Sequence, residues 1–532
     1  MQAFGLSCQG GLNTNLNQFQ MLEQPGFATE LENFEVDPDG GYRRINGYTQ
    51  FGDTNPNSSN SILGLFVYAD GLIACAGTNI YFSLEGEDWI QINKASVAGG
   101  GDNLSTFNSR STATRTTQGQ ATFALFEGSS IYGEVVITDK SSGAKPALFK
   151  MTGTGALANR TFFYEEITVS GSVYPKYCVV HDKHLVVAGA ATALNTIYYS
   201  GTSDINSFTS SGSGSIALDD QVVGIKSFRT DLIIFCKNSI YKLSNINDAD
   251  TIAITPITKN VGCLDGHSIQ EIGGDLLFLS PDGFRLVAGT ERIGDVELGS
   301  VSRQIQSVVS TIAKSIDGFF VSSAVLRSKS QYRFFYSAAT GTTGTSKGLI
   351  GTITPNGFEW SETIGIQAHG FASGLDYSNI EQIYHGDSAG YVYNHNTGND
   401  FNPAGVQTNI NARYKTPNLD FGDAGTLKSL HYTKISFTPE GAVQPSLKVS
   451  YDFDSLDRPQ PPLYTLDEIP TPAVFGAGTL GSSVFGAAGD PMVRTAVQGS
   501  GHNIAFKIFS QDTKAPYSIN GFYVDYRPSG RR

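Results

Sequence analysis

The run VVGIKSFRTDLIIFCKNSIYKL, residues 222–243, contains three apolar segments separated by the short polar turns RTD and KN. Turns this short place consecutive strands side by side in antiparallel order. The run therefore predicts a small antiparallel sheet built from neighbouring parts of the chain, with no helix between its strands.

Similar runs recur every few tens of residues. They combine two or three apolar segments with turns such as DG, PDG or NG, and they lie at residues 63–84, 135–151, 177–200, 268–287, 319–360 and 370–395. Sequence repeats of this period are typical of propellers and solenoids, and a ring of blades leaves only short, protected sheet edges. We predict an all-β fold with a β-propeller of about seven blades, six to eight being possible. Two unrelated β-sandwiches are the alternative.

The repeats also divide the chain into domains. The propeller is expected to span residues 61–405, after a polar N-terminal segment at residues 1–60. Beyond it the chain changes to longer alternating runs, which predict a C-terminal β-sandwich at residues 406–532. Within the propeller, apolar residues at helical spacing in residues 300–316 predict one surface helix inserted between blades.

The sandwich includes a long loop at residues 461–501. The sequence VFGA occurs twice in it, around Phe475 and Phe485. A loop of this length with apolar content seldom stays without a packing partner. It either packs across its own sandwich or projects onto a neighbouring subunit, so Phe475 and Phe485 are candidates for a tip or inter-subunit contact.

The composition limits the classes of function. Charged residues make up 16% of the chain and the net charge is −13, without a long basic run, which argues against tight binding of nucleic acid along an extended face. The five cysteines are widely spaced without a CxxC pair, so we expect them to be small core residues. No signal peptide and no apolar run of the ~20 residues needed for a membrane span is recognised, and synthesis in a reducing cytoplasm is expected.

A search for catalytic motifs finds no metal-binding, P-loop, dinucleotide or nucleophile-elbow pattern. His181 and His184 are interpreted as a surface pair beside a turn. Asp219 and Asp220 are adjacent and would point to opposite faces of a strand, whereas a glycosidase needs two carboxyl groups roughly 5 to 10 Å apart. These two are expected to begin a blade or cap a turn. We therefore predict that the chain is not an enzyme and has no catalytic residue, metal or cofactor.

Several short sequence motifs follow one another along the chain, and their order, rather than any single motif, is characteristic. They are GGLN at 10–13, PGFA at 25–28, LENF at 31–34, RRINGY at 43–48, SGTSD at 200–204, and INGFYVDY at 519–526 before the final GRR. In this order they resemble the hub, nozzle and head-to-tail stabilisation proteins of short-tailed bacteriophages, and the resemblance covers nearly the whole chain.

The resemblance implies a virion structural protein of the phage tail, made in the host cytoplasm. Such a subunit would join copies of itself in a ring, a hexamer being the first expectation, below the portal and adaptor. It would contact other tail proteins, form part of the conduit through which viral DNA passes, and have a possible contact with the host surface. The excess of 49 acidic over 36 basic residues fits a conduit that repels phosphate, if the charge faces the lumen.

The N-terminal segment has two interpretations. It is either a docking segment that orders on contact with the rest of the tail, with Gly11, Leu12, Asn13, Arg43, Arg44 and Tyr48 as candidate residues, or a strap that closes the propeller. Two other functions are weighed against the structural one. A receptor- or glycan-binding propeller of the tail, acting in adsorption, is the alternative, and a glycoside hydrolase is the least favoured.

Overall fold

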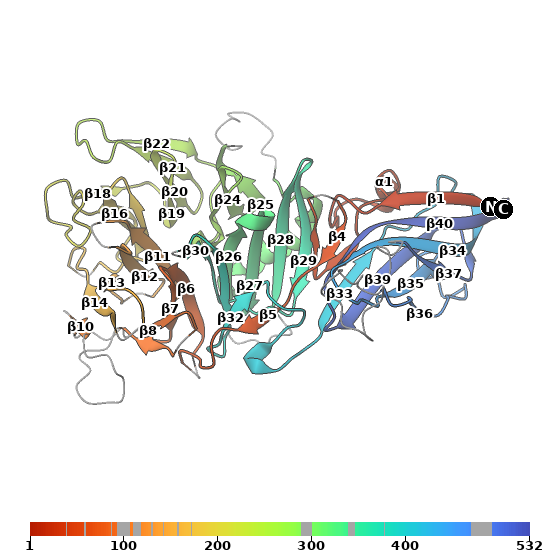
Figure 1. The fold of residues 1–532 in the computed structure, drawn as a ribbon. Helices are drawn as coiled ribbons and strands as arrows, with labels where there is room; N and C mark the ends of the chain where they lie inside the picture. Colours follow the sequence, from red (N-terminus) through yellow and green to blue (C-terminus); the bar gives the residue numbers. More distant parts are fainter. Residues whose placement is uncertain are drawn as a thin grey trace.

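A computed structural model describes most of the chain. The described residues are 1–38, 40–57, 60–86, 88–92, 107–109, 119–128, 131–141, 143–156, 159–171, 173–288, 300–338, 346–376, 378–469 and 492–531. They form a β-propeller and, at one side of it, an elongated β-sandwich with both chain termini at its far end (Figure 1). The predicted fold class is confirmed.

The propeller consists of seven sheets among the described residues, six of them separate and one continuous with the sandwich. Within the blades, their strands pair antiparallel, except for one short parallel pair at the edge of the second blade. The first blade contains β6 (Ile62–Tyr68), β7 (Gly71–Ala76), β8 (Asn79–Leu84) and β9 (Ile90–Gln91), and the second contains β11 (Ala121–Phe126), β12 (Glu134–Asp139), β13 (Ala147–Thr152) and β14 (Thr161–Glu166), with β10 (Phe107–Ser109) beside β14. The third blade contains β15 (Tyr177–His181), β16 (His184–Ala190), β17 (Ala193–Tyr199) and β18 (Gly214–Ala217). The fourth contains β19 (Val222–Phe228), β20 (Asp231–Cys236), β21 (Ile240–Ser244) and β22 (Ala253–Thr258). The strands predicted from residues 222–243 are β19 to β21.

The last three blades complete the circle. The fifth blade contains β23 (Gln270–Ile272), β24 (Asp275–Ser280) and β25 (Gly283–Leu286). The sixth contains β26 (Phe319–Leu326), β27 (Gln331–Ala338), β28 (Lys347–Thr354) and β29 (Gly357–Ile364). The seventh contains β30 (Gly370–Leu375), β31 (Glu381–Gly386), β32 (Val392–His395) and β5 (Tyr48–Gln50). The first strand of each blade is its inner strand. Each inner strand contacts the next, directly or through the 3-10 turn η2 (Gly266–Ser268), and β30 contacts β6. The seventh blade therefore closes against the first.

The core of the propeller lies in layers between adjacent blades. Val136 and Leu185 belong to the layer between the second and third blades, and Phe235 and Phe278, with ring centroids 5.2 Å apart, to the layer between the fourth and fifth. Because each middle strand packs on both sides, strands such as β7 and β16 are buried along their whole length. All five cysteines are buried and free, as expected of small core residues.

Few helices interrupt this architecture. The predicted helix at 300–316 is present as η3 (Arg303–Ile305), α3 (Gln306–Ser315) and η4 (Ile316–Gly318), which lie between the fifth and sixth blades and pack on β25. In the described part of the chain, the others are η2, α1 (Gln18–Leu22), η5 (Arg327–Lys329) and η7 (Pro403–Gly405). Among the described residues, none of these helices has the length and apolar character required to traverse a bilayer.

The sandwich packs two sheets against each other. One contains β1 (Gln2–Ser7), β3 (Phe34–Val36), β4 (Tyr42–Arg44), β34 (Thr426–Pro439), β37 (Met492–Ala496), β38 (Ser500–Gly501) and β40 (Tyr517–Arg531); the other contains β2 (Glu30–Glu32), β33 (Ile410–Lys415), β35 (Ser446–Tyr451), β36 (Tyr464–Thr465) and β39 (Ile504–Asp512). Side chains such as Phe34, Phe437 and Phe506 form one core between them.

The structure divides the N-terminal segment differently from the expected boundary at residue 60. Strands β1 to β4 belong to the sandwich, and β5 is the outer strand of the seventh blade, where it pairs with β32. Four of these strands, β2 to β5, have only three residues, too short to show a periodicity in the sequence. The described parts of the 461–501 loop, β36 to β38, pair within the sandwich, whereas Phe475 and Phe485 lie outside the described residues.

Candidate functional site

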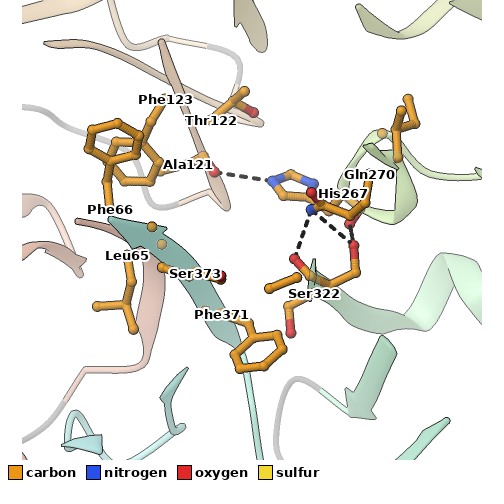
Figure 2. Close-up of a pocket in the computed structure, with 18 of the residues that line it drawn as sticks. Leu65, Phe66, Ala121, Thr122, Phe123, His267, Gln270, Ser322, Phe371 and Ser373 are labelled. Atoms are coloured by element: carbon orange, nitrogen blue, oxygen red, sulfur yellow. Dashed lines mark hydrogen bonds between the residues drawn. The ribbon is translucent and has the colours of Figure 1, made fainter. Parts of the chain in front are cut away.

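A cavity of about 550 Å³ lies where the seven inner strands converge. Its lining comes from β6, β11, β15, β19, β23, β26 and β30 and from η2, so every blade contributes to it. Figure 2 labels lining residues from β6, β11, η2, β23, β26 and β30. This volume lies within the range of small-molecule sites. The cavity is the candidate site because side chains from distant parts of the sequence meet there.

Glycines allow the inner strands to approach closely around the cavity. A Cβ atom on Gly370 would lie 3.2 Å from the Cα of Gly64 on the neighbouring blade, and one on Gly224 would lie 3.1 Å from the Cα of Gly266. Larger residues at these positions would push adjacent blades apart. The four glycines therefore set the width of the ring.

A polar network joins the second and fifth blades beside the cavity. Lys140 Nζ lies 2.6 Å from Asp265 Oδ2 and donates to Gln120 Oε1 at 3.2 Å. The His267 backbone N–H donates to Asp265 Oδ1 at 2.8 Å, and His267 Nε2 lies 3.1 Å from the Ala121 carbonyl oxygen (Figure 2). Burial raises the pKa of the Asp265 carboxyl, but the Lys140 charge and the His267 hydrogen bonds outweigh it and hold the pKa below its usual range. Asp265 is thus ionised and paired with Lys140.

Hydrogen bonds connect the fifth and sixth blades in the same region. Ser323 Oγ donates to the His267 carbonyl oxygen at 2.5 Å, and Gln270 Nε2 donates to the Ser323 carbonyl oxygen at 2.9 Å. Ser322 Oγ donates to the Ala368 carbonyl oxygen at 2.7 Å, just before the seventh blade. Because these side chains bond backbone carbonyls of neighbouring blades, they hold the inner strands in fixed positions.

Aromatic rings form part of the cavity wall. Phe66 of β6 and Phe123 of β11 are stacked, with centroids 5.4 Å apart and an interplanar angle of 17°, and both are half-buried (Figure 2). Phe371 of β30 also lines the cavity and is 9% exposed. Ring surfaces that stay partly exposed beside polar groups suit ligands with alternating apolar and polar faces.

Three charged side chains complete the lining among the described residues: Lys226 of β19, Glu271 of β23 and Arg327, which directly follows β26. We call this group, with the half-exposed Leu375, the mouth of the cavity, since Glu271 and Arg327 are exposed to solvent. Burial lowers the pKa of Lys226; the Glu271 charge opposes this shift and the Arg327 charge adds to it. The three groups thus interact electrostatically, and Glu271 is the one carboxylate in the described lining.

The candidate docking residues from the sequence lie elsewhere, and the first three are held against the sixth blade and the N-terminal loop. Gly11 has a φ of +74° and a Cβ there would lie 2.9 Å from the Trp360 backbone. The Leu12 N–H donates to the Trp360 carbonyl oxygen at 2.7 Å. Asn13 Oδ1 accepts from the N–H groups of Asn15 and Leu16. All three residues are buried.

The other three candidates are equally engaged within the molecule. Arg43 pairs with Glu35 and Glu440, Arg44 is 1% exposed, and Tyr48 of β5 is 2% exposed. Five of the six residues are buried, so they do not form an exposed docking surface in this conformation. Their placement favours the strap over the docking segment.

Two further expectations have different outcomes. His181 and His184 are buried rather than on the surface, because residues of the next blade cover them. Ser227 Oγ lies 2.8 Å from His181 Nδ1, and Asn247 Oδ1 lies 2.9 Å from His184 Nε2. Asp220 caps a turn, as expected: its Oδ2 accepts from the N–H of residue 238 at 2.7 Å.

Sequence reasoning missed the mouth residues and the aromatic wall. Lys226, Glu271 and Arg327 belong to three different blades, so no local spacing brings them together. The available signal was a charged residue inside or directly after the first apolar segment of a repeat.

Comparisons with known proteins add information on the fold. No family model and no curated protein matches the chain. Similar solved structures include a family 43 arabinoxylan arabinofuranohydrolase from Bacillus subtilis in complex with cellotetraose (TM-score 0.27, 11% identity, 90% of this chain and 99% of that chain). They also include an exo-β-1,3-galactanase from Phanerochaete chrysosporium (TM-score 0.25, 9% identity, 91% and 100%). A third is the extracellular domain of a protein described as a one-component system from B. thetaiotaomicron (TM-score 0.40, 9% identity, 88% and 57%).

These comparisons correct one sequence-based prediction. Because two of these three structures are glycoside hydrolases, the prediction that the chain is not an enzyme is contradicted, and we do not retain it. The TM-scores and identities are low, so the likeness concerns the general fold and assigns neither an activity nor a ligand to this chain.

Proposed function

We propose that this chain is a ligand-binding β-propeller that recognises a saccharide in its central cavity, in the manner of a receptor- or glycan-binding protein. The observation that carries the proposal is the convergence of seven inner strands on a cavity of about 550 Å³ that combines half-buried rings with charged groups.

The chemistry of the lining suits a sugar. The pyranose ring has apolar C–H faces, which pack on aromatic rings such as the stacked Phe66 and Phe123. Its hydroxyl groups need hydrogen-bond partners, and the side chains of Glu271, Lys226 and Arg327 offer acceptors and donors. A cavity shaped by hydrogen-bonded strands is already formed before the ligand arrives, which lowers the entropic cost of binding.

The test is a glycan array followed by calorimetric titration of the best ligand. We expect saturable binding, and the substitution Phe66→Ala should weaken it about tenfold or more, because losing a buried aromatic contact costs on the order of 1.5 to 3 kcal/mol. Phe163→Ala is the matched control: Phe163 is a half-buried ring on β14 and does not line the cavity. An array without any saturable ligand, or equal effects of the two substitutions, would contradict the proposal.

A second candidate function is a ring subunit of a phage tail, which rests on the order of the sequence phrases from GGLN to the final GRR. The shape of the molecule is compatible with it, since the sandwich that carries both termini stands to one side of the propeller (Figure 1). A ring of sandwiches would then display propellers. Light scattering and electron microscopy of the purified chain test this: a closed ring supports it, and a monomer at every concentration contradicts it.

A further inference from the structure

The chain as a whole is acidic, whereas basic side chains outnumber acidic ones at the mouth of the cavity. The protein has 49 acidic and 36 basic residues, yet Lys226 and Arg327 outnumber Glu271 at the mouth. A concave site with an excess of one charge raises the local concentration of the opposite charge. The mouth is therefore suited to an anionic group.

Neither cation is neutralised by an ion pair within the described structure. Lys226 Nζ and the Arg327 guanidinium have no carboxylate within the 4.0 Å limit of a salt bridge among the described residues. The Glu381 carboxylate accepts from the Arg327 backbone N–H at 2.6 Å and interacts with the Arg327 charge from farther away. Glu271 acts on Lys226 electrostatically from a greater distance. A half-buried ammonium group without a close partner gains stabilisation when a carboxylate binds beside it.

The net charge of the lining distinguishes between anions. Two cations and one carboxylate leave a charge of about +1, which one sugar carboxylate balances, whereas a phosphate group of charge near −2 exceeds it. A guanidinium group also offers a planar pair of donors that matches the two oxygens of a carboxylate. Glu271 can then accept a hydrogen bond from a neighbouring hydroxyl group.

We propose that the cavity selects saccharides that bear a carboxylate, with Lys226 and Arg327 contacting the acid group and Phe66 contacting the sugar ring. This inference rests on the proposed saccharide-binding function and names its ligand class. Lys226 and Arg327 come from the fourth and sixth blades, so the acid group would be bound between blades. The selectivity then depends on how these blades pack against the fifth blade between them.

The experiment compares three probes by calorimetry: trigalacturonic acid, the neutral galactotriose, and a sulfated galactotriose. We expect the wild-type protein to bind trigalacturonic acid about tenfold more tightly than galactotriose, and salt to weaken only the acid complex. Lys226→Met and Arg327→Met should each remove most of this preference. Because Arg327 is exposed, its substitution tests the idea even if Lys226→Met impairs folding.

Lys242→Met is the matched control. Lys242 lies on β21 of the same blade as Lys226 and does not line the cavity. Equal binding of the acidic and neutral probes, unchanged by Lys226→Met and Arg327→Met, would overturn the acid preference and leave saccharide binding intact. Tighter binding of the sulfated probe would overturn the assignment to a carboxylate. Binding of no probe, combined with an empty glycan array, would refute the proposed function itself.

Discussion

Replacing Glu35 by glutamine should destabilise the junction between the two domains. Glu35 lies on β3 of the sandwich with its side chain 3% exposed. Its Oε1 is 2.7 Å from both Arg43 Nη1 and Lys329 Nζ, and its Oε2 is 2.9 Å from Arg333 Nη2. Lys329 and Arg333 come from the sixth blade, so one carboxylate connects the sandwich to the propeller.

The magnitude follows from the charges around this carboxylate. Burial alone raises the pKa of Glu35, but the charges of Lys329, Arg333 and Arg43 outweigh it and lower the pKa from 4.5 to about 2. At about 1.4 kcal/mol for each pKa unit, the folded protein favours the ionised form by about 3 kcal/mol. Glutamine would also leave three cations without a buried counter-charge, and breaking a buried pair costs about 3 to 5 kcal/mol. We expect Glu35→Gln to lower the free energy of unfolding by about 3 kcal/mol or more.

Urea denaturation monitored by tryptophan fluorescence is the assay, since Trp360 is fully buried in the sixth blade. The folded pKa lies below the unfolded one, so the contribution of Glu35 is present above pH 4.5 and is lost as the pH falls toward about 2. The wild-type protein should therefore lose more stability than Glu35→Gln across this window. Glu440→Gln is the control, because Glu440 also pairs with Arg43 but is 43% exposed. If both substitutions cost the same small amount, the argument from the buried cluster is refuted.

Three other outcomes are expected. Burial lowers the pKa of His385 from 6.5 to about 3, so stability should fall as the pH drops below 6.5, and His385→Phe should flatten this loss in urea titrations between neutral pH and about pH 5. Gly224→Val should cost about 1 to 3 kcal/mol in the same assay, because its side chain would meet Gly266 and Ile269 across the blade boundary. Deleting residues 2–50 removes β1 to β5, and near-ultraviolet circular dichroism should then show loss of tertiary structure; a truncated protein with a native spectrum would instead favour the docking segment.

The blades could be predicted from the sequence because their signals are local. In residues 222–243, the two turns and three apolar segments all lie within one blade, and the structure has β19, β20 and β21 there. The sandwich was harder to delimit, since β2, β3 and β4 have only three residues each, and β2 and β4 pair with strands hundreds of positions away. Such strands acquire their conformation from their partners rather than from their own pattern.

The candidate site was not predictable for a related reason. Lys226, Glu271 and Arg327 meet only because the fourth, fifth and sixth blades pack side by side around one axis. The same packing of neighbouring blades explains the error on His181 and His184: polar residues beside a turn look exposed in one blade, but the next blade covers them. Contacts between blades depend on the whole ring, so a single repeat does not reveal them.

The connection between propeller and sandwich bears on how a bound ligand would be held. Strand β2 pairs with β29 of the sixth blade on one side and with β33 of the sandwich on the other, so one sheet runs without interruption through both domains. The ion cluster around Glu35 adds a second connection, and β5 continues the same N-terminal segment into the seventh blade. With two neighbouring blades tied to the sandwich, the mouth of the cavity has a fixed orientation relative to the termini. A ligand captured there would therefore be presented in one direction by whatever assembly carries the sandwich.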